Sequence, residues 1–194
     1  MLRDLKSSLI AVVVLTIVFG FAYPAVMTGF GQVAFRNKAD GSLVKVDGKV
    51  VGSKLAAQEF KSARYFHSRP SAVGYNAAGT SFANLGPTNP DLAKAIAKEA
   101  KAILELEAPY NPGLTIGDIP VDAVTTSASG IDPDISPANA RLQSRRIAAV
   151  RHLPLGTVQR LISKHTDGRS LGFLGEPGVN VLELNLALDR ETRT

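Results

Sequence analysis

The sequence contains no cysteine among its 194 residues. Disulfide bonds, thiolate metal ligands and a lipid-bearing cysteine are therefore excluded. Histidine is scarce as well. His67, His152 and His165 lie far apart, without a carboxylate at the spacing of a metal-ligand set. This composition argues against a metal site.

Motifs of the common nucleotide-binding and metal-dependent enzymes are also missing. The chain has no Gly-x-x-x-x-Gly-Lys-Ser/Thr phosphate loop, no Gly-x-Gly-x-x-Gly and no His-Glu-x-x-His. The net charge is +5, but the Lys and Arg residues are scattered among nearly as many acids and form no basic run. A nucleic-acid partner is therefore not expected.

Charge is absent from one long segment near the N-terminus, which runs from Ser7 to Phe35. A helix rises about 1.5 Å per residue, so roughly 20 apolar residues cross a hydrocarbon core of about 30 Å. The segment predicts an N-terminal membrane anchor, residues 1–35, with the span at about residues 8–30. Pro24 lies inside the span and is expected to kink the helix.

A cleaved secretory signal is the alternative interpretation of this segment. Arg3 and Lys6 precede the apolar run, and Gly20-Phe21-Ala22 resembles a cleavage site. The apolar character continues well beyond that point, which favours a retained anchor. Basic residues flank the span on both sides, so charge alone does not decide on which side of the membrane the remaining chain lies.

Residues 36–194 are enough for one domain with its own core. Two β-branched runs joined by Asp47-Gly48 predict a hairpin within residues 41–53. We expect helices over residues 54–61, 91–108, 138–152 and 155–165, and short strands over residues 63–71 and 119–126. The predicted fold class is α+β, with one transmembrane helix followed by a single small soluble domain that has a short sheet packed by helices.

The tail allows two structures. Leu182, Leu184, Leu186 and Leu188 alternate with other residues, which favours a half-buried strand over residues 179–189. Asn180 followed three residues later by an acid also forms a capping box, which would begin a helix.

Two loops, residues 72–90 and 127–137, are rich in small and turn-forming residues, and each precedes a predicted helix. Backbone N–H groups at a helix start can hold an anion. The same residues can instead cap the helices and pair the backbone of the loops themselves, and we favour this second interpretation.

Several motifs in and around these loops occur together in one known family. They are Tyr65-Phe66-His67-Ser68-Arg69-Pro70-Ser71-Ala72, Tyr75-Asn76, Asn84-Leu85-Gly86-Pro87, Ser127-Ala128-Ser129-Gly130-Ile131-Asp132-Pro133, Ile135-Ser136-Pro137, Leu171-Gly172-Phe173-Leu174-Gly175-Glu176-Pro177 and Leu184-Asn185-Leu186-Ala187-Leu188-Asp189. In this order they closely resemble the C subunit of the bacterial Kdp-type potassium-transporting ATPase, over nearly the whole chain. Residues 78–83 depart from the family, which tends to be richer in Gly and Ser there.

The resemblance implies a non-catalytic accessory subunit of a high-affinity, ATP-driven potassium uptake complex. Its partners would be a channel-like potassium-binding subunit, a P-type ATPase subunit and the lipid bilayer. The family is placed in the bacterial inner membrane as a single-pass protein, with residues 36–194 as an extracytoplasmic domain on the outer face. The chain has no Asp-Lys-Thr-Gly phosphorylation motif, in agreement with hydrolysis by another subunit.

The family is also described as a catalytic chaperone that raises the ATP affinity of the ATPase subunit. No cofactor is expected to bind firmly, and ATP would be reached through the complex. The resemblance places the nucleotide contact at Gln143. A domain outside the membrane could affect cytoplasmic ATP only by stabilising one conformation of the complex. We therefore favour a polar interface role for Gln143.

We hypothesise that the two loops rest on the channel-like subunit. The candidate contact residues are Ser71, Tyr75, Asn76, Asn84, Gly86, Pro87, Ser129, Gly130, Asp132 and Ser136. A membrane-anchored envelope hydrolase that acts alone is the alternative function.

Overall fold

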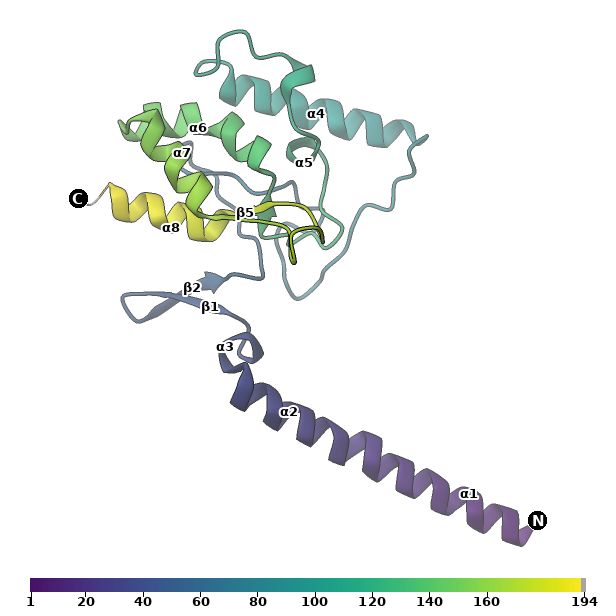
Figure 1. The fold of residues 1–194 in the computed structure, drawn as a ribbon. Coiled ribbons are helices and arrows are strands. Elements are labelled where there is room, and N and C mark those ends of the chain that lie inside the picture. The colour runs from purple at the N-terminus through teal and green to yellow at the C-terminus, as the bar shows by residue number, and fades with distance from the viewer. Residues whose placement is uncertain (193–194) are drawn as a thin grey trace. The chain divides into compact units, whose positions relative to one another are not determined.

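A computed structural model describes residues 1–192 of the chain (Figure 1). The chain divides into two compact units, an N-terminal unit of residues 1–43 and a C-terminal unit from Val44 onward. The α+β fold class is confirmed, because an apolar N-terminal helix is followed by helices and two small sheets.

The N-terminal unit is one long helix, Leu2–Ala34, followed by the short α3 (Arg36–Ala39). The helix consists of α1 (Leu2–Leu15), the π-helical stretch η1 (Thr16–Ala22) and α2 (Tyr23–Ala34). It is long and apolar enough to cross a membrane, and none of its residues is buried in the protein.

The helix is irregular just before Pro24. The N–H of Tyr23 donates to the carbonyl of Val18, five residues earlier, which is the π-helical pattern. Proline has no N–H to continue an α-helical ladder, so a wider turn at this place accommodates the missing donor.

The predicted hairpin is confirmed as β1 (Leu43–Val46) paired with β2 (Lys49–Ser53). Asp47 and Gly48 both have positive φ, 49° and 79°. Two consecutive left-handed residues are what a type I′ turn requires, and Asp-Gly adopts them readily.

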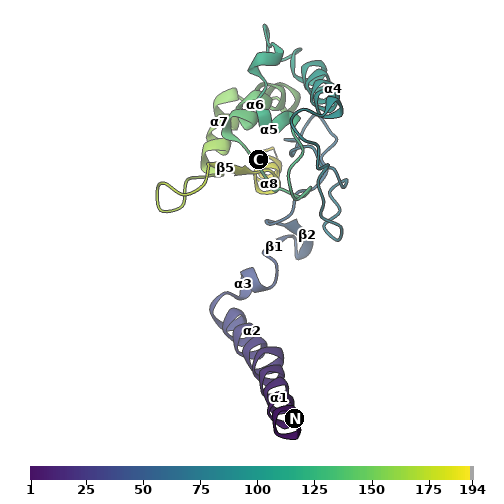
Figure 2. The same cartoon turned by 90° about the vertical axis from the view of Figure 1, so that its right-hand side faces the viewer.

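Four helices dominate the C-terminal unit: α4 (Pro90–Glu107), α6 (Pro137–Arg151), α7 (Leu155–Lys164) and α8 (Val181–Glu191). A small antiparallel sheet has the order β3 (Asp134–Ile135), β5 (Gly178–Asn180), β4 (Thr166–Asp167). Helix α6 packs against both α4 and α7, and α7 packs against α8 (Figures 1 and 2).

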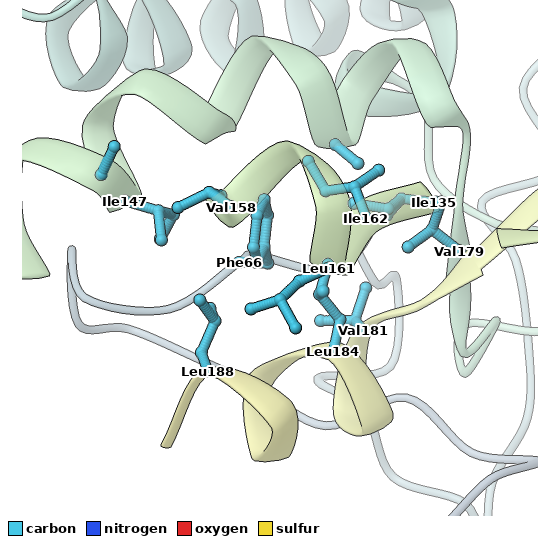
Figure 3. Close-up of a cluster of buried hydrophobic side chains, with 12 residues drawn as sticks. Phe66, Ile135, Ile147, Val158, Leu161, Ile162, Val179, Val181, Leu184 and Leu188 are labelled. Atoms are coloured by element: carbon cyan, nitrogen blue, oxygen red, sulfur yellow. The ribbon is translucent and has the colours of Figure 1, made fainter. Parts of the chain in front are cut away.

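The hydrophobic core lies among α6, α7, α8 and the sheet (Figure 3). Ile147, Val158 and Leu188 come from the three helices, and Val179 comes from β5. Phe66 joins them from a segment outside these elements and is completely buried. Full burial of such a side chain contributes about 1.5–3 kcal/mol.

The helices predicted over residues 91–108, 138–152 and 155–165 are confirmed within a residue or two. Side-chain caps begin α4, α6 and α8. Asn89 accepts a hydrogen bond from the N–H of Asp91, and Ser136 accepts one from the N–H of Asn139. Each cap pairs one of the free donors of a first turn and is worth about 1 kcal/mol.

The strand predicted for the tail is wrong, because residues from Val181 form helix α8. Asn180 caps it by accepting from the N–H of Glu183 at 3.1 Å. Val181, Leu184 and Leu188 are buried at helical spacing. The N-cap at Asn180 therefore agrees with the observed structure, and the alternating leucines lie on two buried sides of one helix.

Two further predictions are wrong. Residues 54–61 form turns and irregular structure in place of a helix. Residues 119–126 form no strand but follow the 3₁₀ turn η2 (Ile116–Asp118) with a single helical turn, α5 (Val121–Val124). This turn directs Asp122 to the start of α6, where its carboxylate accepts from the N–H and Oγ of Ser136 at 2.8 and 2.7 Å. That tertiary contact outweighs the β propensity of the valines and threonines.

Candidate functional site

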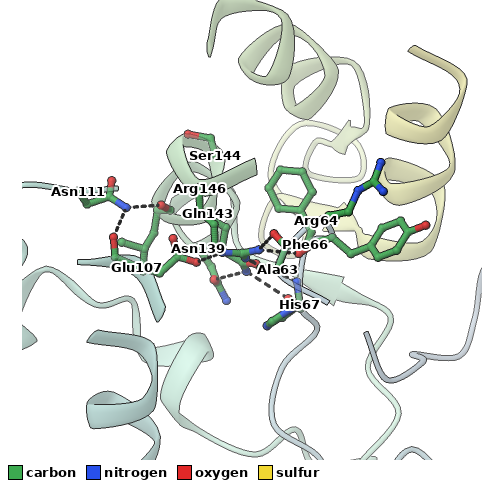
Figure 4. Close-up of polar contacts among 12 residues, drawn as sticks. Ala63, Arg64, Phe66, His67, Glu107, Asn111, Asn139, Gln143, Ser144 and Arg146 are labelled. Atoms are coloured by element: carbon green, nitrogen blue, oxygen red, sulfur yellow. Dashed lines mark hydrogen bonds and ion pairs between the residues drawn. The ribbon is translucent and has the colours of Figure 1, made fainter. Parts of the chain in front are cut away.

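Residues 63–67, which we call the clamped segment, run between α6 and α8. The predicted strand over residues 63–71 is wrong, because these residues belong to no helix or strand. Their backbone groups are paired by side chains instead of by a neighbouring strand (Figure 4). The aromatic character of residues 63–71 favours a strand, but in the folded chain side chains take the place of the neighbouring strand.

Two side-chain amides hold the middle of the clamped segment. Gln143 Oε1 accepts from the N–H of His67 at 2.8 Å, and Gln143 Nε2 donates to the carbonyl of His67 at 3.1 Å. Asn185, on α8, does the same for Phe66 at 2.8 and 2.9 Å. An amide side chain carries a donor and an acceptor, so each one replaces the peptide group of a missing strand.

Arg146 holds the beginning of the clamped segment and is fully buried. Its Nη1 donates to the carbonyls of Ala63 and, at 3.0 Å, Tyr65. Its Nη2 donates to Gln143 Oε1 at 2.9 Å, and its Nε donates to Glu107 Oε1 at 2.7 Å. Four hydrogen bonds, one of them to a carboxylate, compensate the burial of this charge.

Every hydrogen-bond donor and acceptor of the Gln143 side chain has a partner. Besides the bonds to His67 and Arg146, its Nε2 donates to Asn139 Oδ1 at 2.9 Å. The side chain is only 6 % exposed. Its geometry is that of a structural clamp inside the C-terminal unit.

Burial shifts the pKa of two groups beside the clamp. Desolvation, followed by the positive charge of Arg146, lowers the pKa of His67, so that its ring is neutral at neutral pH. His67 Nε2 lies 3.1 Å from the carbonyl of Ser62, which can only accept, so this nitrogen carries the hydrogen. Desolvation raises the pKa of Glu107, although Arg146 opposes this shift.

A cavity of about 240 Å³ opens between α4, α6 and the end of the clamped segment. His67 and Gln143 line it together with three carboxylates, Glu59, Glu99 and Glu107. No lysine or arginine belongs to its lining. The cavity is therefore a poor place for a phosphate group.

The two predicted loops meet each other. Ser71 Oγ donates to the carbonyl of Gly130 at 2.5 Å, and Arg69 Nη1 pairs with Asp132 Oδ2 at 3.0 Å. Gly130 has φ +71°, and a Cβ there would lie 2.5 Å from Val73 Cγ2. Glycine is required at this crossing for both its backbone angle and its size.

The structure separates the candidate contact residues into groups. Ser71, Tyr75, Gly130 and Asp132 come together at the crossing of the loops, and Ser136 caps α6 nearby. Asn76, Asn84, Gly86, Pro87 and Ser129 are exposed. Exposed loop residues remain available to a partner, whereas the partly or fully buried ones shape the loops.

An exposed apolar turn between β4 and β5 was not among the predicted contacts. Leu171, Phe173 and Leu174 are 83, 69 and 50 % exposed. Ser170 and Leu174 exchange two backbone hydrogen bonds of 2.9 Å, so the turn has a defined shape. The run Leu-Gly-Phe-Leu, apolar yet flanked by glycines, was the available sequence signal. We call residues 169–176 the apolar turn.

The segment Gly168-Arg169-Ser170-Leu171-Gly172, which overlaps the start of the apolar turn, has the spacing of a hydrolase nucleophile elbow. Such an elbow requires a serine between a strand and a helix. Ser170 instead lies in an exposed turn between two strands. The context therefore does not support an envelope hydrolase. Among residues 1–192, no group of three or more His, Asp or Glu side chains could hold a metal ion.

Comparison with known proteins gives one consistent result. The family model for KdpC, the K⁺-transporting ATPase c chain, matches residues 5–190. The potassium-transporting ATPase KdpC subunit of Mycobacterium tuberculosis (strain ATCC 25618 / H37Rv) is 48 % identical over 192 residues, covering 98 % of this chain and 100 % of that protein. The KdpC subunit of Bradyrhizobium diazoefficiens is 46 % identical over 204 residues, and that of Methylococcus capsulatus 47 % over 192, each with at least 97 % of both chains covered. The chain belongs to the KdpC family, the c chains of K⁺-transporting ATPases.

Proposed function

We propose that this chain is a non-catalytic accessory subunit that stabilises the association of a channel-like potassium-binding subunit with a P-type ATPase subunit. Family membership over the whole length carries the proposal. The structure supports it, because the polar residues of the clamp are occupied in holding the fold and leave no nucleophile–base pair among them.

We assign the helix Leu2–Ala34 as a single-pass anchor in the bacterial inner membrane, with the C-terminal unit on the outer face. Its length and its lack of charge from Ser7 to Phe35 support the anchor. The side of the membrane follows from the family resemblance alone.

The apolar turn is our candidate for the main contact with a partner subunit. Three large apolar side chains protrude from a turn of defined shape, whereas scattered single apolar residues are usual on a surface. Arg169 Nη2 lies 2.8 Å from both carboxylate oxygens of Glu176, which joins the two ends of the turn. Contact with an apolar depression on a membrane subunit would remove these side chains from water. The exposed residues of the two loops, Asn76, Asn84 and Ser129 among them, would extend this contact.

An effect on ATP affinity would act through the conformation of the complex. A direct contact of ATP with Gln143 would have to break hydrogen bonds to His67, Arg146 and Asn139. It would also bring phosphates to a cavity lined by carboxylates. A domain that binds one conformation of its partners more tightly changes their affinity for another ligand without touching it.

Purification of the complex tests the proposal. Full-length chain, a chain lacking residues 1–35 and no chain at all are each produced with the other two subunits, and the complex is isolated in detergent. We expect both partners to be recovered together only with the full-length chain. Equal recovery and equal potassium-stimulated ATP hydrolysis without the chain would overturn the proposal.

A further inference from the structure

One residue in the lining of the cavity between α4 and α6 has an unsatisfied acceptor. Glu107 Oε1 is paired with Arg146, but Oε2 has no hydrogen-bond partner in the described part of the chain. The side chain of Glu107 is 2 % exposed and lines the cavity. Buried acceptors in proteins are almost always paired, so this oxygen marks a place for a donor.

The charge around the cavity has one sign. Glu59 and Glu99 also line it. Burial raises the pKa of Tyr75, which lines the same cavity, and the negative charges of Glu59 and Glu99 raise it further. Arg146 forms an ion pair with Glu107 but does not line the cavity. A donor group that enters the cavity is stabilised there if it carries a positive charge. A phosphate group would be repelled by the carboxylates.

The remaining wall combines apolar and polar side chains. Phe60, Ile103, Leu106 and Leu142 supply the apolar surface, and Ser68 and Asn139 supply polar atoms. Within the described residues 1–192, no group of three or more His, Asp or Glu side chains could hold a metal ion, whereas an aliphatic stem gains from contact with the apolar side chains. The volume of about 240 Å³ accommodates a group of several non-hydrogen atoms.

We propose that this cavity binds an organic cation, an ammonium or guanidinium group on a short aliphatic stem, which donates to Glu107 Oε2. The cation is either a free alkylamine or the end of a Lys or Arg side chain of a neighbouring subunit. The site lies in the C-terminal unit alone, so the inference does not depend on the proposed function.

Saturation-transfer NMR tests this site on the full chain in deuterated detergent, with n-butylammonium chloride as the probe. We expect saturable binding with a dissociation constant on the order of millimolar, as a ligand of this size allows. Butanol, which has the same stem without the charge, and ATP should show no transfer. Absence of saturable butylammonium binding, or displacement of it by ATP, overturns the proposal.

Two substitutions on α4 locate the binding. Glu99→Gln removes a carboxylate of the cavity wall and should weaken butylammonium binding about threefold to fivefold. Glu105→Gln removes an exposed carboxylate, 3.9 Å from Lys101 on the same helix, and should leave binding unchanged. Equal weakening by both would mean unspecific attraction to an acidic surface and would overturn the proposal.

The assembled complex distinguishes the two sources of the cation. Binding of butylammonium to the isolated chain and to the complex indicates a free small cation. Binding to the isolated chain alone indicates that a side chain of a neighbouring subunit fills the cavity in the complex. Both results support the site.

Discussion

Replacement of Gln143 by alanine should destabilise the C-terminal unit, whatever its effect on nucleotide. The substitution deletes four hydrogen bonds, which leaves both backbone groups of His67, one donor of Arg146 and the oxygen of Asn139 without this partner. These groups are buried or partly buried, so protein partners cannot readily replace the lost amide.

The size of the effect follows from the kinds of bond lost. Three neutral hydrogen bonds contribute about 1 kcal/mol each and the bond from Arg146 about 1.5–3 kcal/mol, or roughly 5 kcal/mol together. Water that enters from the adjacent cavity can pair some of these groups, and alanine favours the helix by a few tenths of a kcal/mol. We expect a net loss of about 2–4 kcal/mol, which lowers the melting temperature of a domain of this size by roughly 5–15 °C.

Thermal unfolding of the full-length protein in detergent, followed by circular dichroism, measures this loss. Gln159→Ala is the matched control, because Gln159 is an exposed glutamine on α7. If Gln143→Ala melts within about 1 °C of this control, the clamp does not hold the unit together and our argument is wrong. If the variant lowers ATP affinity of the intact complex without loosening it or lowering its stability, a direct nucleotide contact is favoured over the clamp.

Three further predictions concern other parts of the C-terminal unit. Gly130→Ala should destabilise it by about 1–3 kcal/mol in urea unfolding, because the new Cβ would lie 2.5 Å from a valine methyl carbon at a positive φ, whereas Gly156→Ala, with nothing within 4 Å, should not. The pKa of His67 is lowered from 6.5 by burial and Arg146, so the unfolded state binds more protons and stability should fall as the pH drops below about 6.5. In His67→Gln this pH-dependent loss should be smaller than in the parent protein, since other titrating groups are common to both and cancel in the difference. Phe173→Ser should leave the melting temperature unchanged, because the side chain is exposed, but reduce recovery of the partner subunits; equal recovery would exclude the apolar turn as a contact.

Local signals in the sequence were sufficient where neighbouring residues decide the structure. Asp47-Gly48 fixes a turn by its own backbone angles, and Asn89 and Ser136 pair donors only two or three residues away. The tail was predicted wrongly because leucine alternation was given more weight than the cap at Asn180, which is the more local signal.

Distant contacts could not be predicted in this way. The strand predicted over residues 63–71 rests on their aromatic character. The hydrogen-bond partners are Gln143, 76 residues after His67, and Asn185, 119 residues after Phe66. Nothing near the segment indicates that side chains will replace a strand. The structural role of Gln143 could not be predicted either. The family resemblance alone made it a candidate residue, and its role depends on the backbone of His67, which it contacts only in the folded state.

The hydrogen bonds between Phe66 and Asn185 also determine at which stage of synthesis the C-terminal unit can complete its folding. Asn185 lies on α8, 119 residues after Phe66, so a polypeptide still on the ribosome has no group with which to complete this pairing until α8 has been made. Contacts between residues so far apart bring a large loop-closure cost before they stabilise anything. The unit should consequently complete its folding in one concerted step only after α8 has been synthesised, and a chain that is cut before Asn185 should fail to fold as a whole.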